Sequence, residues 1–311
     1  MKLLITVGAG FLGSHLSRTL LAQGHEILCL DNLYTGRIKN IEGLISNQKF
    51  RFIDQDVQDT LDFEIEGIFN LACPASPIHY QRDPVRTLRT NVQGAINVLE
   101  LARRNDARVL QASTSEVYGD PKVNPQNELY WGNVNPIGIR SCYDEGKRAA
   151  ETLFSDYHRQ YATDTRIARI FNTYGPGMAS DDGRVVSNLI CQAIKNEPLT
   201  IYGDGSQSRS FCYVSDLIDG LISLFFKENF LSPVNLGNPF PRTMNQLANE
   251  ITRISKSDSK IEFVKLPKDD PLIREPDITV ATAELNWQPK VELEEGLIRT
   301  VQYFRDELLE K

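Results

Sequence analysis

The residue pair with the clearest chemical potential is Tyr143 and Lys147, which lie four positions apart at the start of a segment that reads as a helix. Positions i and i+4 of a helix share one face, so the ammonium of Lys147 can lie beside the phenol of Tyr143. A neighbouring cation favours the phenolate and lowers the tyrosine pKa from about 10, which would make Tyr143 a general base for a sugar hydroxyl. Taken alone, the spacing also fits a packed aromatic ring beside a solvated lysine, so its meaning depends on the surrounding elements.

A glycine-rich turn near the N-terminus predicts a dinucleotide-binding element. The apolar run Leu3–Val7 reads as a buried strand, and Gly8-Ala9-Gly10-Phe11-Leu12-Gly13 then leads into an amphipathic helix that ends near Gln23. A second strand follows over 26–30 and ends at Asp31. The glycines let the backbone approach a pyrophosphate, the helix N-terminus attracts it, and the carboxylate of Asp31 accepts hydrogen bonds from ribose hydroxyls. Because that carboxylate would repel a 2′-phosphate, the pattern predicts NAD rather than NADP, although a plain glycine turn could show the same glycines.

Strands and helices keep alternating through the first half of the chain. We expect buried strands at Phe50–Ile53, Gly67–Ala72 and Ala107–Ala112, with a long amphipathic helix over Pro84–Arg104. This order predicts the α/β fold class, a Rossmann-type doubly wound parallel sheet whose ligands lie at the carboxyl ends of the strands. Asp56 follows one strand end and could reach the adenine side of a dinucleotide, or could instead cap a helix.

After about Pro176 the regular alternation breaks. Helical runs are then interleaved with short strands, and the helical runs are Val185–Asn196, Val214–Phe226, Met244–Ser255 and Glu294–Leu309. We therefore expect an NAD-binding domain over 1–175 and a smaller C-terminal α/β substrate lobe over 176–311. The boundary is approximate because the chain passes back and forth.

Composition places limits on the partners. With 311 residues, 41% hydrophobic and 24% charged, the chain has the composition of an ordinary globular protein. Its net charge of -7 argues against wholesale binding to nucleic acid or to an anionic membrane, while leaving room for an anionic small ligand. The five scattered cysteines form no C-x-x-C pair, which predicts free thiols and neither a metal site nor a disulfide framework. The first residues already read as a strand, which leaves no room for a signal peptide, and no apolar run approaches the length of a membrane span. We therefore expect a cytoplasmic protein.

Longer motifs carry a more specific resemblance. The strings are Ser113–Pro121, Tyr130–Gly138 (Tyr-Trp-Gly-Asn-Val-Asn-Pro-Ile-Gly), Ser141–Arg148 (Ser-Cys-Tyr-Asp-Glu-Gly-Lys-Arg), Ala168–Pro176 and Asp182–Asn188. With them the chain resembles the extended short-chain dehydrogenases/reductases that act on nucleotide sugars. Within that superfamily it closely resembles the UDP-glucuronate decarboxylases, also called UDP-xylose synthases. The similarity runs from about Lys2 to about Leu308.

The resemblance implies a reaction in which NAD is recycled. UDP-glucuronate would be oxidised at C4, the resulting β-keto acid would lose carbon dioxide, and bound NADH would reduce the UDP-4-keto intermediate to UDP-xylose. Related sugar-nucleotide 4,6-dehydratases carry an Asp-Glu pair where this chain has Ser115-Glu116. Dehydration needs an acid for the departing hydroxyl and oxidation at C4 does not, so this pair favours the decarboxylase.

The resemblance also implies roles for individual residues. Tyr143 takes and returns the C4 hydroxyl proton, while Lys147 lowers its pKa and contacts the nicotinamide ribose. Thr114 and Ser115 donate hydrogen bonds near the reacting oxygen, and Glu116 manages a proton at C5. Strand-end capping by Thr114 and Ser115, and a structural ion pair for Glu116, stay open as alternatives.

Two sets of binding residues follow from the same resemblance. The NAD set is Gly8, Gly10, Phe11, Leu12, Gly13, Asp31, Asn32, Thr35, Gly36, Asp56, Val57, Leu71, Cys73, Thr90, Ala112, Tyr143, Lys147, Thr173 and Arg184. The UDP-sugar set is Asn172, Tyr202, Gln207, Arg209 and Arg274. Arg209 would bind phosphate and Arg274 the glucuronate carboxylate, which also makes Arg274 a catalytic residue; a surface salt bridge is the alternative for each. The helices at 84–104 and 143–161 match those that pair two subunits in this superfamily, so we expect a homodimer.

Two residues depart from the family pattern. Relatives carry a glycine where this chain has Val7, and often a serine where it has Cys73. A β-branched residue tolerates positive φ poorly, so we expect Val7 to weaken NAD binding without abolishing the fold. A thiol is a weaker hydrogen-bond donor than a hydroxyl, which puts one cofactor contact of Cys73 in doubt. A UDP-uronate or UDP-hexose 4-epimerase, and a non-catalytic protein that binds NAD or a nucleotide sugar, stay open as alternatives.

Overall fold

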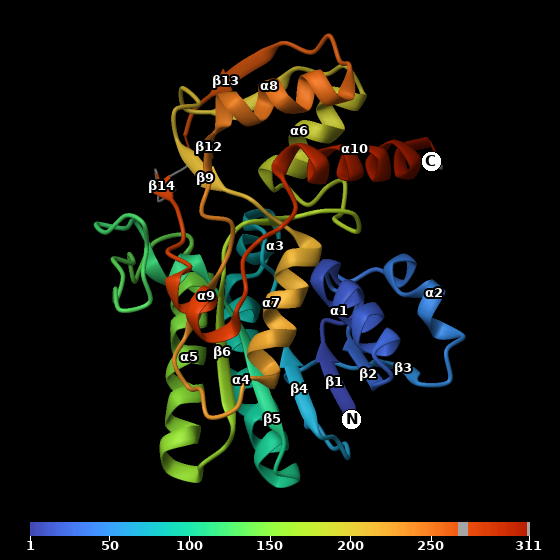
Figure 1. The fold of residues 1–311 in the computed structure, drawn as a ribbon, viewed down its shortest axis with the longest axis vertical. Helices are drawn as coiled ribbons and strands as arrows, with labels where there is room; N and C mark the ends of the chain where they lie inside the picture. Colours follow the sequence, from blue (N-terminus) through green and yellow to red (C-terminus); the bar gives the residue numbers. More distant parts are fainter. Residues whose placement is uncertain (267–272, 310–311) are drawn as a thin grey trace.

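A parallel sheet forms the centre of the molecule (Figure 1), whose computed structural model describes residues 1–266 and 273–309. Within these residues the sheet has seven strands in the order β11-β6-β5-β4-β1-β2-β3, and every neighbouring pair is parallel. The bounds are β1 Lys2–Thr6, β2 Glu26–Asp31, β3 Phe50–Asp54, β4 Gly67–Asn70, β5 Arg108–Thr114, β6 Thr165–Ile170 and β11 Val234–Leu236. The predicted Rossmann-type fold is confirmed. The strand order changes direction on either side of β1, which is the position where such sheets bind their ligands.

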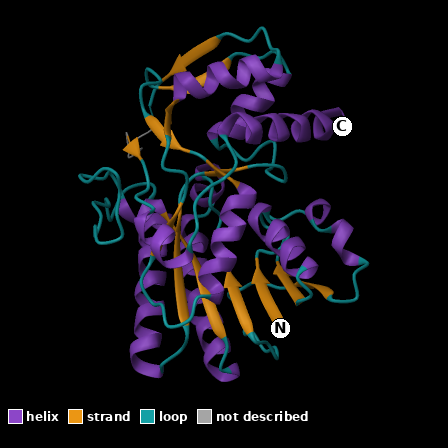
Figure 2. Ribbon diagram, in the orientation of Figure 1, coloured by secondary structure: helices purple, strands orange, loops and turns teal. Residues whose placement is uncertain are grey.

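Helices cover both faces of the sheet (Figure 2). The covering helices are α1 (Phe11–Ala22), α4 (Pro84–Asn105), α5 (Ser141–Tyr161) and α7 (Val214–Phe226). Leu3 and Ile5 of β1 belong to the hydrophobic core on the side of α1 and α7, whereas Leu4 belongs to the core on the side of α4 and α5. Alternate strand residues point to opposite faces, so a sheet covered on both sides needs the uninterrupted apolar run seen in the sequence.

A smaller lobe lies over the carboxyl ends of these strands, at the top of Figure 1. It consists of α6 (Val185–Ile194), α8 (Met244–Ser255), α10 (Leu293–Leu309), the parallel pair β8 (Leu199–Tyr202) and β13 (Ile261–Val264), and the sheet β12 (Pro241–Thr243), β9 (Ser208–Ser210), β14 (Ile273–Arg274). The chain interleaves, because α7 and β11 return to the main sheet between β10 (Cys212–Tyr213) and β12. The division at residue 175 therefore stays a prediction, and residues 267–272 and 310–311 of the predicted lobe lie outside the described residues.

The remaining elements are short and connect the larger ones. They are η1 (Ile38–Asn40), α2 (Glu42–Ile45), α3 (Pro77–Arg82), η2 (Ser115–Tyr118), β7 (Thr173–Tyr174) and α9 (Thr279–Leu285). Across the described parts of the chain, none of the helices is both long and apolar enough to cross a membrane. The five cysteines are free thiols.

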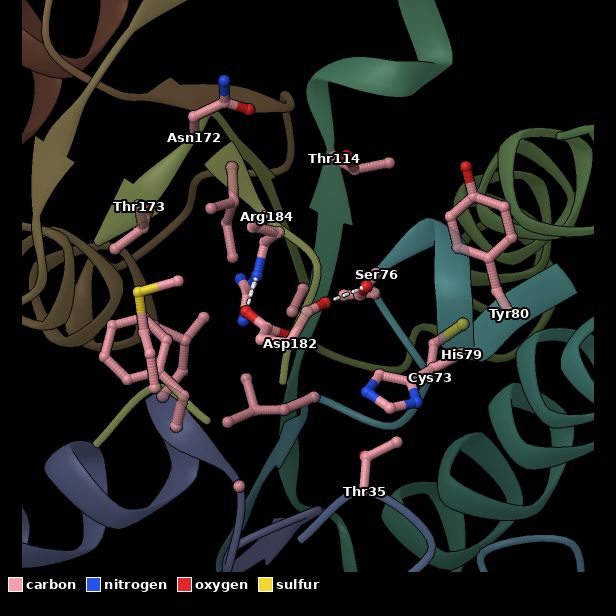
Figure 3. Close-up of a pocket in the computed structure, with 18 of the residues that line it drawn as sticks. Thr35, Cys73, Ser76, His79, Tyr80, Thr114, Asn172, Thr173, Asp182 and Arg184 are labelled. Carbon is pink, nitrogen blue, oxygen red and sulfur yellow. Dashed lines mark hydrogen bonds and ion pairs between the residues drawn. The ribbon is translucent and has the colours of Figure 1, made fainter. Parts of the chain in front are cut away.

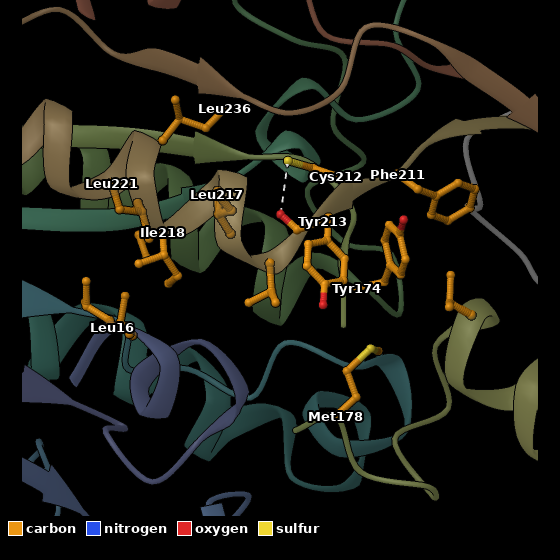
Figure 4. Close-up of a cluster of buried hydrophobic side chains, with 14 of the residues drawn as sticks. Leu16, Tyr174, Met178, Phe211, Cys212, Tyr213, Leu217, Ile218, Leu221 and Leu236 are labelled. Carbon is orange, nitrogen blue, oxygen red and sulfur yellow. Dashed lines mark hydrogen bonds between the residues drawn. The ribbon is translucent and has the colours of Figure 1, made fainter. Parts of the chain in front are cut away.

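Packed aromatic rings join the lobe to the sheet (Figure 4). Tyr174 of β7 and Tyr213 of β10 meet edge to face, with ring centroids 5.6 Å apart, and their strands pair in parallel. The Tyr174 hydroxyl donates to the carbonyl of Leu293 at the start of α10. A side chain at Gly296 would occupy the position of that hydroxyl. This packing holds β7 in place, and β7 carries Thr173 to the edge of the cavity described below.

Candidate active site

A cavity of about 280 Å³ lies between the carboxyl edge of the sheet and the lobe. Thr114 at the end of β5, Tyr143 and Lys147 of α5, and Asn172 before β7 contribute to its wall. In Figure 3, Asn172 and Tyr80 stand on opposite sides of the cavity with Thr114 between them. Residues far apart in the chain thus meet where a doubly wound sheet is expected to bind its ligand.

Tyr143 and Lys147 lie in the first two turns of α5 and are 6% and 3% exposed. The Lys147 Nζ donates a hydrogen bond to the Ala112 carbonyl oxygen at 2.8 Å and lies 5.9 Å from the centre of the Tyr143 ring. The hydroxyl of Thr114 is hydrogen-bonded to the Tyr143 phenol. On the other side, Tyr80 stacks on the same ring at a centroid distance of 5.0 Å. The phenol is therefore fixed in direction by one hydrogen bond and one stacked ring.

The pKa of Tyr143 behaves differently from the prediction. Burial raises the pKa of the phenol above its ordinary value, Cys73 adds to this rise, and the hydrogen bond with Thr114 acts against it. Burial also lowers the pKa of the Lys147 ammonium. The predicted lowering of the Tyr143 pKa by Lys147 is thus wrong for the protein alone, because desolvation of the phenolate outweighs a cation that is already bound to a backbone carbonyl. A phenolate at this position requires further positive charge near the ring.

Buried charges form a second cluster at the cavity wall. Glu116 in η2 is 8% exposed, and its Oε2 accepts hydrogen bonds from Arg140 Nη2 at 2.6 Å and from Arg274 Nη2 at 2.7 Å. Burial alone would raise the pKa of Glu116, but the charges of Arg274, Arg140 and Arg209 hold it below its ordinary range. Nearby, burial and the charge of Glu116 raise the pKa of Asp144 to about 7. The site therefore combines one carboxylate held ionised by arginines with one carboxyl group that titrates near neutral pH.

The turn between β1 and α1 forms a cradle for phosphate. Val7 has a φ of 52°, and the N–H of Gly10 donates to the Val7 carbonyl at 3.0 Å, directly before α1 begins at Phe11. A Cβ atom on Gly13 would collide with the Val7 carbonyl and with Gly8, so glycine is required for this close packing. Gly10 has no side chain to cap α1, and residues 10–13 at the start of the helix line the cavity, so the uncapped helix N-terminus lies where an anion could bind.

A second, smaller cavity lies on the other side of Val7, which lines both. Asp31 at the end of β2 lines this cavity, and its carboxylate accepts hydrogen bonds from the N–H groups of Ala9 at 3.0 Å and Leu33 at 2.8 Å. Burial raises the pKa of Asp31, and these two donors act against the rise. Any side chain at Gly36 would collide with the carboxylate, so Gly36 keeps the space beside it open. This is the position predicted to receive an adenosine ribose.

Asp56 stands across the same small cavity. Its Oδ2 accepts from the Asn32 amide at 2.7 Å and from Arg86 at 3.0 Å, and the Arg86 guanidinium lies 4.4 Å from the centre of the Tyr34 ring. Arg86 and Tyr34 were not singled out from the sequence, since nothing in their local pattern distinguishes them from surface residues. Together the two cavities, joined at the glycine turn, fit a dinucleotide with its pyrophosphate at the N-terminus of α1.

Comparison with known families identifies the chain. The family profile described as "NAD dependent epimerase/dehydratase family" matches residues 3–237. The chain belongs to this family. UDP-glucuronic acid decarboxylase 1 of Arabidopsis thaliana is 53% identical over 309 residues, which cover 99% of this chain and 71% of that protein. UDP-glucuronic acid decarboxylase 1 of Danio rerio is also 53% identical, over 99% of this chain and 73% of that protein.

Solved structures agree with this membership. The UDP-glucose 4-epimerase of Thermotoga maritima, determined with UDP-glucose, has a TM-score of 0.90 at 30% identity and covers 99% of this chain and 100% of its own. The UDP-glucuronic acid 4-epimerase of Bacillus cereus, in complex with UDP-glucuronic acid and NAD, has a TM-score of 0.89 at 28% identity over 99% and 100%. The predicted superfamily resemblance is confirmed, and NAD is the cofactor of this family member.

The two cavities separate the predicted site residues into groups. The larger one is lined by Gly10, Phe11, Leu12, Gly13, Leu71, Ala112, Thr114, Ser115, Glu116, Tyr143, Lys147, Asn172, Thr173 and Arg184. The smaller one is lined by Asp31, Asn32, Asp56, Val57 and Thr90, while Thr35 and Cys73 line both. Six predicted residues line neither cavity, namely Gly8, Gly36, Tyr202, Gln207, Arg209 and Arg274.

The last four of these residues lie in or beside the short strands of the lobe. Tyr202 is 47% exposed at the end of β8, and Gln207 donates to its carbonyl. Arg209 of β9 and Arg274 of β14 are buried and stand opposite each other on paired strands. The alternative prediction of a surface salt bridge is therefore wrong for both arginines, because both are buried. Arg274 forms its ion pair with the buried Glu116.

Arg140 and Tyr80 line the larger cavity but were not predicted from the sequence. Cys73 was predicted, but its contact differs from the expected one. Arg140 precedes the Ser141–Arg148 motif by one residue, and its position next to that motif was the available signal. Tyr80 of α3 had no local signal. Cys73 accepts a hydrogen bond from Asn91 at 3.0 Å, and burial raises the pKa of its thiol to about 11, so it stays neutral.

Proposed function

We propose that the protein is an NAD-dependent UDP-glucuronate decarboxylase that forms UDP-xylose and carbon dioxide. The observation that carries the proposal is the 53% identity to UDP-glucuronic acid decarboxylases over 99% of this chain, against 30% and 28% for the solved epimerases. Ser115 beside Glu116 supports it, because a dehydratase would use a second carboxyl group there.

The charge distribution suits an acidic sugar. Arg140, Arg209 and Arg274 come from three separate elements and all act on Glu116. Arg274 contacts Glu116 through Nη2, and its side chain makes no other hydrogen bond within residues 1–266 and 273–309. Arg274 can exchange this contact for the carboxylate of the sugar, for which a planar guanidinium is well shaped.

We assign the chemical steps to residues of the larger cavity. When bound, NAD supplies the acceptor for the C4 hydride and the donor that returns it to the ketone. Tyr143 takes the proton of the C4 hydroxyl and gives it back at the end, while Thr114 and Ser115 donate hydrogen bonds to the C4 oxygen. In the β-keto acid the C5–C6 bond breaks, its electron pair moves to the C4 oxygen, and carbon dioxide leaves. C5 then receives a proton from solvent through a water molecule that the ionised Glu116 holds.

We also infer a cytoplasmic homodimer that pairs through α4 and α5. Val85 and Leu88 of α4 are 69% and 42% exposed, and Trp131 and Ile137, in the segment before α5, are 88% and 92% exposed. Large exposed apolar side chains support such a contact, because apolar surface that gathers into a patch commonly marks a contact between proteins. Light scattering coupled to size-exclusion chromatography measures the mass directly, and a monomeric mass at micromolar concentration would contradict the dimer.

The experiment that tests the function is incubation with UDP-glucuronate and catalytic NAD, followed by measurement of carbon dioxide and of the nucleotide sugar formed. UDP-xylose with stoichiometric carbon dioxide supports the proposal. Tyr143→Phe should reduce this rate by about 10²–10⁴-fold, the usual contribution of a general base. A product with the mass of the substrate would instead indicate a 4-epimerase, the second candidate, which the likeness to the Bacillus cereus UDP-glucuronic acid 4-epimerase favours.

A further inference from the structure

One cavity residue has no chemical step assigned to it in the function proposed above. Arg140 lies at the N-terminus of α5, its side chain is 10% exposed, and it lines the larger cavity. Its carbonyl oxygen accepts the backbone N–H groups of Tyr143 and Asp144, at 2.9 and 3.1 Å. Its guanidinium reaches in the other direction to Glu116. Arg140 is thus connected to the assigned base through its backbone and, through its side chain, to the carboxylate assigned to hold the water at C5.

The two arginines on Glu116 hold it in different ways. Arg140 comes from the same domain as Glu116 and contacts Oε2 at 2.6 Å. Arg274 comes from β14 of the lobe, and its Nη2 lies 2.6 Å from Oε1 and 2.7 Å from Oε2. If Arg274 is to bind the substrate carboxylate, this contact with Glu116 must weaken or break. A buried carboxylate without a partner is strongly unfavourable, so one partner has to remain.

We propose that Arg140 is a positioning residue that keeps Glu116 ionised and in place while Arg274 transfers its contact to the carboxylate of the sugar. The inference rests on the proposed function, because the transfer requires an acidic sugar as substrate. This role differs from direct binding of the substrate, because Arg140 acts on the substrate only through Glu116. Removing its charge should therefore change the protonation of Glu116 and the chemical step more than the binding of substrate.

Several groups face Glu116 and contribute to its titration. The positive ones are Arg140 from α5, Arg209 from β9 and Arg274 from β14, of which Arg274 and Arg140 have the larger effect. Glu116 in turn raises the pKa of Asp144 on α5, and it acts in the same direction on Tyr80 of α3 and on Tyr143. Once the sugar carboxylate engages Arg274, Arg140 is the remaining arginine with a hydrogen bond to Glu116 that the structure describes.

The first test is the pH dependence of kcat and KM for carbon dioxide release by the holoenzyme with UDP-glucuronate. Loss of one close opposite charge shifts a carboxyl pKa by about 1–3 units, so Arg140→Gln should move the acidic limb of kcat upward by at least about one unit. At a pH one unit below the new limb, kcat falls about tenfold, while KM changes less than about threefold. Arg140→Lys keeps the charge and should recover much of the native profile. Arg253→Gln, which removes an exposed ion pair between α8 and Glu294, is the matched control and should behave like the native enzyme.

A double-mutant cycle tests the same idea without turnover. If Arg140 serves chiefly to compensate Glu116, Arg140→Gln should lower the melting temperature clearly in the native background and much less in a Glu116→Gln background. An unshifted kcat profile, or equal destabilisation in both backgrounds, would overturn the inference. Absence of carbon dioxide release from the native enzyme would instead contradict the proposed function, and the melting experiment would still report on the pair of Arg140 and Glu116.

Discussion

Replacing Val7 by glycine should stabilise the protein and tighten NAD binding through two separable effects. Val7 has a φ of 52°, in a region that costs a β-branched residue about 1–2 kcal/mol. Glycine removes that strain but adds about 0.5–1 kcal/mol of backbone entropy loss on folding. The net gain is about 0.5–1 kcal/mol. With an unfolding entropy of about 2.1 cal/mol/K per residue over 311 residues, the melting temperature of the apoprotein should rise by about 1–2 °C.

The effect on NAD comes from the side chain. Val7 lines both cavities, so its methyl groups lie beside the path by which a dinucleotide would join the two. Methyl groups that crowd a bound pyrophosphate act like extra methylenes in a packed core, which cost about 1–3 kcal/mol. Val7→Gly should therefore lower the Kd for NAD by about tenfold, which corresponds to about 1.4 kcal/mol. Isothermal titration calorimetry with NAD and the apoprotein measures it.

Two further variants separate backbone strain from bulk. Val7→Ala removes the methyl groups but keeps a Cβ at positive φ, so it should tighten NAD binding with little gain in stability. Lys256→Gly relieves a similar φ of 51° at the exposed C-terminus of α8, and should raise the melting temperature while leaving the Kd for NAD unchanged. Equal Kd values for the native, Val7→Ala and Val7→Gly proteins would refute the reasoning about the turn.

Two other predictions concern the charged cluster. Arg274→Gln should raise the KM for UDP-glucuronate by about 10–100-fold, which corresponds to the loss of a charged hydrogen bond of about 1.5–3 kcal/mol. Binding of UDP-glucose, whose sugar has no carboxylate, should stay within a few-fold of native when measured by calorimetry. A similar loss for both ligands would contradict the role of Arg274. Asp144→Asn should stabilise the protein increasingly as the pH rises from about 4 to about 7, because the folded pKa of about 7 lies above the ordinary value of 3.8 and the native folded state becomes less stable over that window. Melting temperatures at pH 5 and pH 8 check this, and an advantage of Asp144→Asn that is equal at both would show that Asp144 does not carry the raised pKa.

Local patterns were enough to predict the strand-turn-helix unit at the N-terminus. The apolar run of β1, the glycines and Asp31 are near one another in the sequence, and each follows from a backbone or hydrogen-bonding requirement that short stretches satisfy alone. The positive φ of Val7 could also be predicted locally, because it depends on the turn itself. These features needed no knowledge of distant segments.

Long-range contacts account for what the sequence could not provide. Glu116 is 24 positions from Arg140 and 158 positions from Arg274, and Arg86 meets Asp56 across 30 positions. Nothing in the spacing of an arginine shows which carboxylate it will reach once the sheet and lobe have formed. The resemblance supplied Arg274 because its motif is distinctive, whereas Arg86 has no such string around it, and Arg140 lies next to a motif that does not show which carboxylate it reaches.

The sign of the Tyr143 pKa shift has the same origin. The spacing of Tyr143 and Lys147 correctly placed both on one face of α5, but a pKa depends on the charges and the solvent around the group together. Lys147 is bound to Ala112, 35 positions upstream, and burial of the phenol outweighs its charge. Because the phenol is neutral in the protein alone, the proposed role of Tyr143 as a base requires further positive charge beside it, which a bound cofactor would supply. Sequence spacing thus predicts the geometry of the proposed base, and the charges around the phenol decide its protonation.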